Sequence, residues 1–390
     1  MLNRECPICG EKIGSVLKNI KMALSEDVRI PREYDVVNCI NCGFTYADVN
    51  ATQEDYNFYY AMDNNYADST EIKLVGKNTS VIHMLNYLKR HIDVNEKILD
   101  VGCGSGELLI SLKNAGYTNL WGLDPTQGAI DILAAQQING IKKNVFDEWK
   151  IEDKFDVIIS TCVLEHIYDL RGFINKIIEH LKVGGQFYVV VPAVEGFEQY
   201  YQSLPNYFNQ EHINYFSANS LKNLMLSNGF EELLSNSASF YMISNLVSNG
   251  DLMLQNMFMY TGREEKINKF DSVSSSSILN YFKHCDLDNK KSSLLESMQK
   301  IDDGCIIWGS GALAMSMMAD KDFVEKVDFF VDNNKAKQGK DILGKKIFSP
   351  SILLDKEYEK KTIIVMCMQY SNEIVEQIKE MNLQNSVIVY

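Results

Sequence analysis

The sequence predicts an α/β protein in which a cysteine-rich N-terminal lobe precedes two separate parallel-sheet domains. Two Cys-x-x-Cys pairs stand within the first 50 residues. A strand, a glycine turn and a helix are indicated over residues 98–113, and the same pattern returns from residue 305. After each turn, strand-like apolar runs alternate with helical apolar spacing, which is typical of parallel sheets with crossover helices. We expect domains at residues 1–70, 71–250 and 251–390.

The composition narrows the class of protein and its partners. The chain has 390 residues, 46% of them hydrophobic, which is enough for more than one core. Its formal net charge of −14 argues against nucleic acid, whose binding needs Lys and Arg to neutralise phosphates. No apolar run approaches the roughly 20 residues that span a membrane, and the first residues lack the apolar segment of a signal peptide. We therefore expect a cytoplasmic protein without a nucleic-acid or membrane partner.

The N-terminal cysteines have the spacing of a metal site. Four of the nine cysteines form the two pairs, Cys6 with Cys9 and Cys39 with Cys42, and a glycine follows each pair. Four thiolates complete a tetrahedral Zn²⁺ shell and leave no position for water, so the metal is expected to be structural. Incidental buried cysteines, the alternative, do not explain the paired spacing. The odd number of cysteines also favours a reducing compartment, in which the protein has no disulfide framework.

Residues 51–70 are rich in aromatic side chains and lack a regular pattern. The aromatic residues are Tyr56, Phe58, Tyr59, Tyr60 and Tyr66. Two interpretations are open: these side chains join the cysteine lobe to the next domain, or they form a lid over a substrate. A helix is then indicated from Ser80 to Arg90, ahead of the first glycine turn.

The first glycine turn is the candidate ligand site of the central domain. Gly102, Gly104 and Gly106 follow the strand Ile98–Val101 and precede a helix. Glycine adopts positive φ and lets the backbone approach a ligand with its amide groups exposed. Asp100, two residues before the first glycine, disfavours a pyrophosphate and suits an ammonium group. S-adenosylmethionine (SAM) is a nucleoside ligand with such a group.

Two further carboxylates follow strands in the same domain. Asp124 ends the predicted strand 120–124, twenty residues beyond Gly104, where a carboxylate can accept hydrogen bonds from both ribose hydroxyls. Asp147 closes the next unit and could accept from an adenine amino group, with Phe146 against the ring. A fourth strand, 155–160, is apolar enough to be buried on both faces.

In their order and spacing, these segments resemble the motifs of class I SAM-dependent methyltransferases over roughly residues 75–235. The matching segments are Asp100–Gly106, Asp124, Asp147, Phe155–His166 and Leu181–Gly185. The resemblance implies a Rossmann-like core with SAM as cofactor. It implies that Asp100, Gly102 and Gly104 surround the methionine moiety, that Asp124 binds the ribose and that Asp147 binds the adenine.

A histidine just past the fifth strand is the candidate general base. His212 has an unperturbed pKa near working pH and lies beside Glu211, which either orients it or is solvated. His166 is a rival, to which we assign a structural or positioning role. Ser217 is expected to cap a helix that ends near Gly229.

The C-terminal third repeats the strand, turn and helix pattern after a polar segment. Residues 271–277 read as a flexible linker, and a helix is indicated from Ile278 to about Lys300. Gly309, Gly311 and Ala314 then form a G-x-G-x-x-A turn after a strand. This second Rossmann-like α/β domain either binds a ligand or serves only for packing.

The three-part order resembles the sugar C-methyltransferases, which methylate nucleotide-linked 4-keto deoxysugars. The resemblance implies a nucleotide-sugar substrate, SAM, a structural Zn²⁺, and a monomer or homodimer. It assigns His212 as the base, with Glu211 beside it and Tyr215 close by. Where the family often has a tyrosine, two residues before the glutamate, this chain has Asn209.

The chemistry that the resemblance implies is deprotonation of a carbon next to a carbonyl. The resulting enolate carbon attacks the sulfonium methyl of SAM, and Tyr215 or a tyrosine of residues 51–70 donates a hydrogen bond to the enolate oxygen. One alternative is O- or N-methylation of another small metabolite, with His212 deprotonating a hydroxyl. Another is a non-catalytic binding protein with a decayed core, against which the intact Asp100–Gly106 and Asp124 motifs count.

Overall fold

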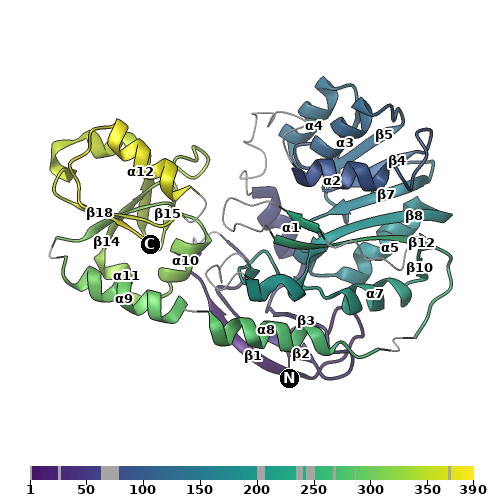
Figure 1. Cartoon of the computed structure of the whole chain (residues 1–390), viewed down its shortest axis with the longest axis horizontal. Coiled ribbons are helices and arrows are strands. Elements are labelled where there is room, and N and C mark those ends of the chain that lie inside the picture. Colours follow the sequence, from purple (N-terminus) through teal and green to yellow (C-terminus); the bar gives the residue numbers. More distant parts are fainter. Residues whose placement is uncertain are drawn as a thin grey trace. The chain divides into compact units, whose positions relative to one another are not determined.

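The computed structural model describes most of the chain and divides it into two compact units. The first comprises Met1–Lys18, Asp35–Gln199 and Glu211–Asn280, and the second comprises Asn19–Tyr34, Tyr200–Gln210 and Tyr281–Tyr390 (Figure 1). The described residues are 2–24, 28–62, 79–199, 207–233, 240–242, 251–266, 269–285, 287–301, 303–367 and 370–390.

The first unit is built on an eight-stranded mixed sheet. Its strand order is β10-β12-β8-β7-β4-β5-β6, and β11 pairs with β12. The parallel strands are β4 (Ile98–Val101), β5 (Leu120–Asp124), β6 (Asn139–Lys142), β7 (Phe155–Thr161) and β8 (Leu181–Pro192). The antiparallel strands are β10 (Phe230–Glu232), β11 (Phe240–Met242) and β12 (Asp251–Tyr260). β12 lies in this sheet although it falls within the residues expected to form the C-terminal domain.

Helices cover both faces of this sheet (Figure 1). The helices are α2 (Thr79–Leu88), α3 (Glu107–Asn114), α4 (Gln127–Ala135), α5 (Leu170–His180) and α7 (Ala218–Leu226). Successive strand residues point to opposite faces, so two cores form. Ile98 belongs to the core beneath α2, α3 and α4, whereas Leu99 belongs to the core that contains the apolar side chains of α5 and α7.

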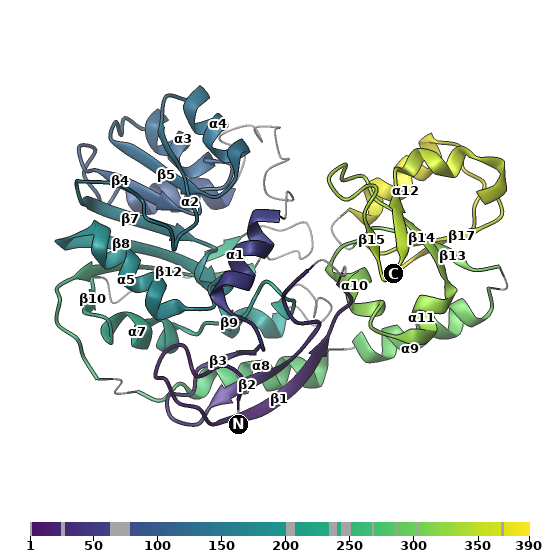
Figure 2. The same cartoon turned by 180° about the vertical axis from the view of Figure 1, so that it is seen from behind.

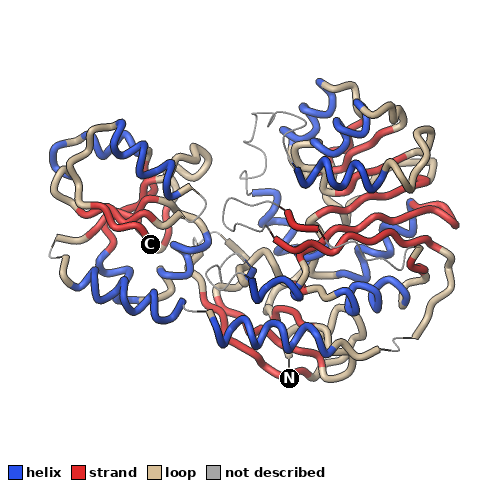
Figure 3. Tube along the Cα trace, in the orientation of Figure 1, coloured by secondary structure: helices blue, strands red, loops and turns tan. Residues whose placement is uncertain are grey.

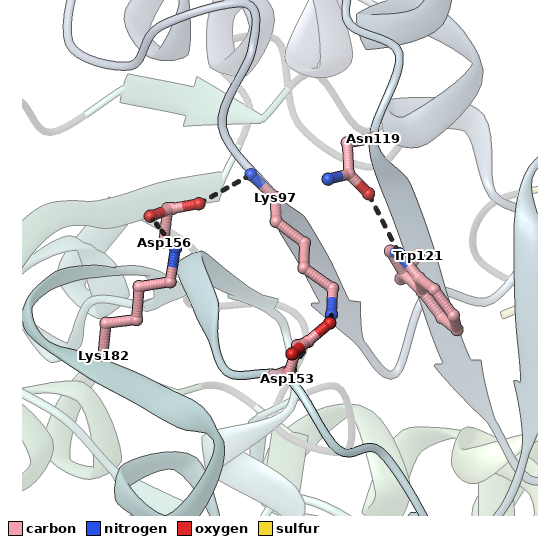
Figure 4. Close-up of polar contacts among 6 residues, drawn as sticks. All are labelled: Lys97, Asn119, Trp121, Asp153, Asp156 and Lys182. Carbon is pink, nitrogen blue, oxygen red and sulfur yellow. Dashed lines mark hydrogen bonds and ion pairs between the residues drawn. The ribbon is translucent and has the colours of Figure 1, made fainter.

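Polar contacts tie together the amino-terminal ends of three parallel strands (Figure 4). The Lys97 amide donates to Asp156 Oδ2 (3.0 Å), and the Lys182 ammonium lies 2.6 Å from Asp156 Oδ1. The Lys97 ammonium donates to the Asp153 carbonyl (3.0 Å) and lies 5.3 Å from the Trp121 ring centroid. These contacts lie at the amino-terminal edge of the sheet. Ligands of such sheets bind at the opposite edge, where the strands have their carboxyl-terminal ends.

The cysteine lobe carries a second sheet, most of whose residues belong to the first unit. Its order is β1-β2-β3-β9, with β1 at Gly14–Lys21, β2 at Glu33–Cys39, β3 at Thr45–Asp48 and β9 at Asn214–Tyr215. β9 pairs antiparallel with β3, Tyr46 opposite Asn214. The segment that follows His212 is therefore a strand of the cysteine lobe's own sheet.

Two segments that the sequence predicts to be irregular form helices in the structure. Residues 53–62 form α1 (Gln53–Met62), and the predicted linker 271–277 is wrong because α8 runs over Ser272–His284. Asp271 is fully buried; its Oδ1 accepts from the Val273 and Ser274 amides (3.1 and 3.2 Å). A carboxylate that caps a helix start explains why a serine run can be helical. Tyr66 lies outside the described residues.

The second unit holds a six-stranded sheet with the order β15-β16-β14-β13-β17-β18. Its strands are β13 (Cys305–Trp308), β14 (Val327–Val331), β15 (Asp341–Ile342), β16 (Lys345–Phe348), β17 (Thr362–Val365) and β18 (Val387–Val389). Its helices are α9 (Leu287–Gln299), α10 (Ala312–Met317), α11 (Lys321–Lys326) and α12 (Ser371–Glu380) (Figure 2). The predicted strand, glycine turn and helix at residues 305–314 are confirmed.

Figure 3 separates the helices and strands of each unit by colour. The single helix predicted from Ile278 to Lys300 is replaced by α8 and α9. Among the residues that the structure describes, no helix is both long and apolar enough to cross a membrane.

Candidate functional site

A cavity lies at the carboxyl-terminal ends of β4, β5 and β7. Gly102 and Gly104 line it from the first glycine turn, and Asp124 lines it from the end of β5. Three further segments line the cavity. Their lining residues are Asn144–Phe146; Cys162, Val163, His166 and Ile167; and Gln53, Asn57 and Tyr60 of α1. Parallel α/β sheets bind their ligands at this edge. Tyr60 is one of the aromatic residues for which a lid over a substrate was one of the two interpretations, whereas Gln53 and Asn57 were not singled out from the sequence.

Each of the three glycines in the turn has a positive φ, at +75° for Gly102, +50° for Gly104 and +69° for Gly106. A Cβ on Gly102 would lie 2.7 Å from Val163 Cγ2, and one on Gly106 would lie 2.6 Å from Leu133 Cδ2. A Cβ on Gly104 would meet nothing within 4 Å. Gly104 therefore faces open space, as a backbone that approaches a ligand requires.

Asp124 holds the glycine turn against the end of β5. Its Oδ2 accepts from the Gly104 amide (3.0 Å), and its Oδ1 accepts from the Thr126 amide (2.9 Å) and hydroxyl (2.7 Å). Each carboxylate oxygen can accept more than one hydrogen bond. Asp124 can therefore order the turn and still accept from a ribose hydroxyl in the cavity.

Asp100 is a buried carboxylate with an unsatisfied oxygen. It is 2% exposed, and its Oδ1 has no hydrogen-bond partner among the described residues. Burial, and secondarily the nearby Asp124, raises the pKa of Asp100 to about 7. A buried carboxylate without a partner is unstable as an anion unless a cation or donor approaches it. The ammonium group of SAM is such a partner, so the Asp100 carboxylate has the acceptor chemistry that the cofactor requires.

Phe146 and Asp147, the two residues expected beside the adenine, are placed differently relative to the cavity. Val145 and Phe146 line the cavity, whereas Asp147 is exposed and its Oδ2 accepts from the Asn144 amide (2.9 Å). The structure therefore brings the aromatic ring of this segment to the cavity. The contact of Asp147 with adenine stays a prediction.

The structure brings the two candidate histidines together. The rings of His166 and His212 lie edge to face, with centroids 4.8 Å apart. Burial lowers the pKa of His166 to about 4; burial and then His166 lower that of His212 to about 3. Both imidazoles are therefore neutral near pH 7, as a proton acceptor must be. His166 lines the cavity, and the His212 ring contacts the His166 ring from the neighbouring segment.

Two tyrosines of α1 reach the histidine segments. The Tyr59 hydroxyl donates to Glu211 Oε1 (2.8 Å), and the Tyr60 hydroxyl lies 3.0 Å from His166 Nδ1. His166 Nδ1 also lies 3.0 Å from the Glu211 carbonyl. A carbonyl can only accept, so this contact is satisfied when Nδ1 carries the proton and leaves Nε2 as the acceptor. Tyr215, the third predicted catalytic residue, is buried in β9.

Glu165 is a second buried carboxylate that sequence reasoning did not single out as a functional residue. It is 2% exposed, and neither oxygen has a hydrogen-bond partner in the described part of the chain. Burial raises the pKa of Glu165 to about 8. His166 Nε2 lies 3.9 Å from Glu165 Oε1. Donor atoms of Glu165, His166 and His212 lie within 4.8 Å of one another, a spacing that also suits a metal ion.

The four predicted cysteine ligands converge at one point in the N-terminal lobe. The sulfurs of Cys6 and Cys42 lie 3.5 Å apart and those of Cys9 and Cys39 lie 3.4 Å apart; all four lie within 4.8 Å of one another. A tetrahedral ion with Zn–S bonds of about 2.3 Å separates its sulfurs by about 3.8 Å. The cluster therefore has the size and the donor set of a Cys₄ zinc site.

Family models match two parts of the chain. One, described as a methyltransferase domain, matches residues 77–235. Another, described as C2185-like, N-terminal, matches residues 301–389.

Curated relatives match a shorter stretch. The chain is 34% identical over 94 residues to a ubiquinone biosynthesis O-methyltransferase of Rickettsia canadensis (strain McKiel), covering 23% of this chain and 39% of that protein. It is 33% identical over 104 residues to the protein of that name from Bartonella tribocorum (strain CIP 105476 / IBS 506), covering 24% of this chain and 40% of that protein. The chain thus spans less than half the length of these relatives.

Solved structures also align with the chain. The 1,6-didemethyltoxoflavin-N1-methyltransferase of Burkholderia thailandensis aligns with a TM-score of 0.43 and 14% identity, over 62% of this chain and 99% of that chain. The SAM-bound magnesium protoporphyrin IX methyltransferase of Synechocystis PCC 6803 aligns with a TM-score of 0.37 and 14% identity, over 54% and 99%.

The family model covers the glycine turn, the histidine pair and the cavity lining other than Gln53, Asn57 and Tyr60 of α1. It agrees with the ordered motifs of the sequence and with a parallel sheet whose carboxyl edge carries an acidic, glycine-lined cavity. Residues 77–235 are a class I SAM-dependent methyltransferase domain, and the protein is therefore an enzyme.

Proposed function

We propose that this protein transfers the methyl group of SAM to a carbon of a nucleotide-linked keto-deoxysugar. The observation that carries the proposal is the contact between the His166 and His212 rings beside the cofactor cavity. Two neutral imidazoles at this position supply a proton acceptor where a methyl acceptor has to be activated. SAM, when bound, supplies an electrophilic methyl group on a sulfonium.

The glycine turn and two carboxylates hold the cofactor in this proposal. Asp100 faces the ammonium group, and the exposed backbone at Gly104 lies against the methionine moiety. Asp124 accepts from the ribose while its bond to the Gly104 amide keeps the turn in place. Phe146 packs beside the adenine.

His212 removes the proton from the carbon next to the sugar's carbonyl. The electrons of that C–H bond move into the carbonyl, which becomes an enolate oxygen, and a tyrosine hydroxyl donates to it; Tyr60 is the candidate at the cavity. The carbon then forms its bond to the methyl group as the S–CH₃ bond breaks, which leaves neutral S-adenosylhomocysteine. Glu211, held by Tyr59, keeps the His212 segment in place. The proton on His212 passes to water.

The second unit carries a candidate nucleotide-binding turn of its own. Its glycine turn follows β13, and Ser310 there donates to Asp332 Oδ2 through its amide (2.9 Å) and hydroxyl (2.6 Å). Asp332 follows β14, the neighbouring strand of the sheet. A carboxylate beside a glycine turn at adjacent strand ends is the arrangement of nucleotide-binding folds.

An alternative is O-methylation, which a separate observation favours. The donor atoms of Glu165, His166 and His212 have a spacing that suits a divalent ion, and such an ion would activate a substrate hydroxyl without a histidine base. The curated relatives that match this domain are named O-methyltransferases. Activity that is lost with EDTA and restored by a divalent ion that two imidazoles and a carboxylate suit, such as Fe²⁺, favours this alternative.

Product analysis separates the two functions. The full chain is incubated with SAM labelled with ¹³C in its methyl group and with a panel of nucleotide-linked 4-keto deoxysugars. We expect a new methyl signal bonded to carbon by NMR and the corresponding mass increase. A methyl signal bonded to oxygen would assign O-methylation, and failure to methylate any keto sugar would refute the proposed substrate class.

We further propose that the four cysteines bind one structural Zn²⁺. Elemental analysis of freshly purified protein is expected to give about one zinc per chain. Cys42→Ser should lower the zinc content and the melting temperature, because the ion stabilises a lobe with little core of its own. Cys285→Ser, outside the cluster, is the matched control and should retain zinc. Folded wild-type protein without zinc would overturn the proposal.

SAM binding is expected to release a proton from Asp100. Without cofactor the raised pKa, about 7, leaves Asp100 mostly protonated at pH 6; pairing with the ammonium lowers that pKa, so the proton leaves. Affinity should therefore fall about tenfold per pH unit below 7 and level off above it. Calorimetry at pH 6 in buffers of different ionisation enthalpy counts the proton. Asp100→Asn should bind weakly without release; equal release in wild type and variant contradicts the assignment.

A further inference from the structure

Arg4 is a buried cation whose guanidinium joins two separate segments of the first unit. Its side chain is 3% exposed. The guanidinium donates to the carbonyls of Ile167 (3.2 Å) and Tyr168 on one segment. It donates to the Ile213 carbonyl (3.2 Å) and to Asn214 Oδ1 (3.0 Å) on the other.

Asn214 connects the same two segments from the opposite direction. Its Nδ2 donates to the carbonyls of Leu164 (2.8 Å) and Ile167 (2.6 Å). Its Oδ1 accepts from Arg4. Residues 164–168 carry His166, and residues 211–215 carry His212. The two side chains therefore fix the spacing of the backbone segments on which both imidazoles stand.

Arg4 is itself held by the cysteine lobe. Its backbone amide donates to Asp48 Oδ1 (2.7 Å), and its carbonyl accepts from the Tyr46 hydroxyl (3.2 Å). It stands two residues before Cys6. The lobe's sheet reaches the histidine segment as well, because β3 pairs with β9. Arg4 and Asn214 are thus both part of the lobe that carries the four cysteines.

The chemistry of Arg4 is that of a positioning residue. Its guanidinium bonds to three backbone carbonyls and an amide oxygen, all within the protein, and its burial keeps it from solvent. Backbone carbonyls are acceptors that a planar guanidinium can join at fixed angles, whereas an ammonium bonds from one point. The rate of proton transfer depends on the distance between the reacting groups, and a displacement of about 1 Å can lower that rate about 100-fold.

We propose that Arg4 and Asn214 form a clasp that sets the geometry of the His166–His212 pair and makes that geometry depend on the cysteine lobe. The proposal rests on the proposed role of His212 as the base. It assigns to the lobe a function in catalysis beyond its own folding.

The test compares Arg4→Met, Arg4→Lys and Asn214→Ser with Arg171→Met in the full chain. Arg171 is the matched control: its guanidinium also ties the cysteine lobe to the core, donating to the Ile8 carbonyl (2.9 Å), but its contact joins neither histidine segment to the other. Each variant is assayed for kcat and KM on a nucleotide-linked keto sugar that the wild type methylates. SAM affinity, zinc content and the NMR signals of the His166 and His212 rings are measured as well.

Arg4→Met and Asn214→Ser are expected to lower kcat by about 100-fold and to shift both imidazole signals. SAM affinity and zinc content should stay within about twofold of wild type, since neither residue contacts the glycine turn or the cysteine sulfurs. Arg4→Lys keeps the positive charge but not the planar set of guanidinium donors, so this variant should lose less kcat than Arg4→Met. Arg171→Met should leave kcat and the imidazole signals near wild type.

Three outcomes would overturn the clasp: unchanged imidazole signals in Arg4→Met, an equal loss of kcat in Arg171→Met, or a parallel loss of SAM affinity. If Arg4→Met fails to fold, Arg4→Lys and Asn214→Ser carry the same readouts. The NMR signals need no sugar. Shifted imidazoles in a protein that methylates no nucleotide sugar would therefore support the clasp and refute the proposed substrate, whereas unshifted imidazoles with intact turnover would do the reverse.

Discussion

Replacing His212 with alanine is expected to lower kcat by about 10²–10⁴-fold, the usual contribution of a general base, and to change SAM affinity by less than about twofold. The reason is positional: His212 contacts His166 rather than the glycine turn, so its loss removes a proton acceptor and leaves the cofactor contacts intact. S-adenosylhomocysteine release under saturating substrate measures kcat, and calorimetry measures the affinity.

Two companion variants make this result specific. His166→Gln keeps a hydrogen-bonding side chain on the cavity wall and should lower kcat less than His212→Ala if His166 only positions its neighbour. His83→Ala, an exposed histidine on α2, should leave both measurements unchanged. A larger loss in His166→Gln than in His212→Ala would transfer the role of base to His166. A large loss of SAM affinity in His212→Ala would mean that the residue belongs to the cofactor site.

Asp124→Ala is expected to weaken SAM binding by about 1.5–3 kcal/mol, or roughly 10- to 150-fold. Two contributions act together. The ribose loses an acceptor, and the Gly104 amide loses the carboxylate oxygen 3.0 Å away that holds the turn. Binding measured by calorimetry at fixed pH and salt gives the free-energy change directly.

Asp131→Ala is the matched control for this measurement. Asp131 is exposed on α4 and accepts only a local bond from Gln127 (2.8 Å), so its removal changes the charge without changing the turn. Asp124→Asn separates the two contributions, because an amide oxygen still accepts from Gly104 but the carboxylate charge is gone. Unchanged affinity in Asp124→Ala would exclude the ribose role.

Local patterns in the sequence predicted the elements that carry the cofactor cavity. The run Ile98–Val101, the three glycines and the helical spacing after them specify a strand, a turn and a helix through contacts within a few residues. The same holds for the turn at Gly309 in the second unit. The Ser217 cap of α7 also formed as predicted, with Ser220 completing the capping box.

Helix starts that depend on distant partners were missed. The serine run after Asp271 reads as a linker because serine favours turns and caps. In the structure Asp271 Oδ2 accepts from the Ser217 hydroxyl (2.6 Å), 54 residues away in sequence. This buried contact fixes the cap and so allows α8 to begin. Sequence patterns over a few residues cannot reveal a hydrogen-bond partner that lies close only in the folded chain.

By itself, the sequence determined the fold class, the first glycine turn and the four cysteines that meet in the N-terminal lobe, because each depends on residue types at short, fixed spacing. Only the tertiary structure decided which groups surround His212. Tyr59 meets Glu211 across 152 residues and His166 meets the Glu211 carbonyl across 45. Such contacts follow from the order of strands in the sheet and from burial, which also lowers the pKa of both histidines. Neither property is a function of neighbours along the chain.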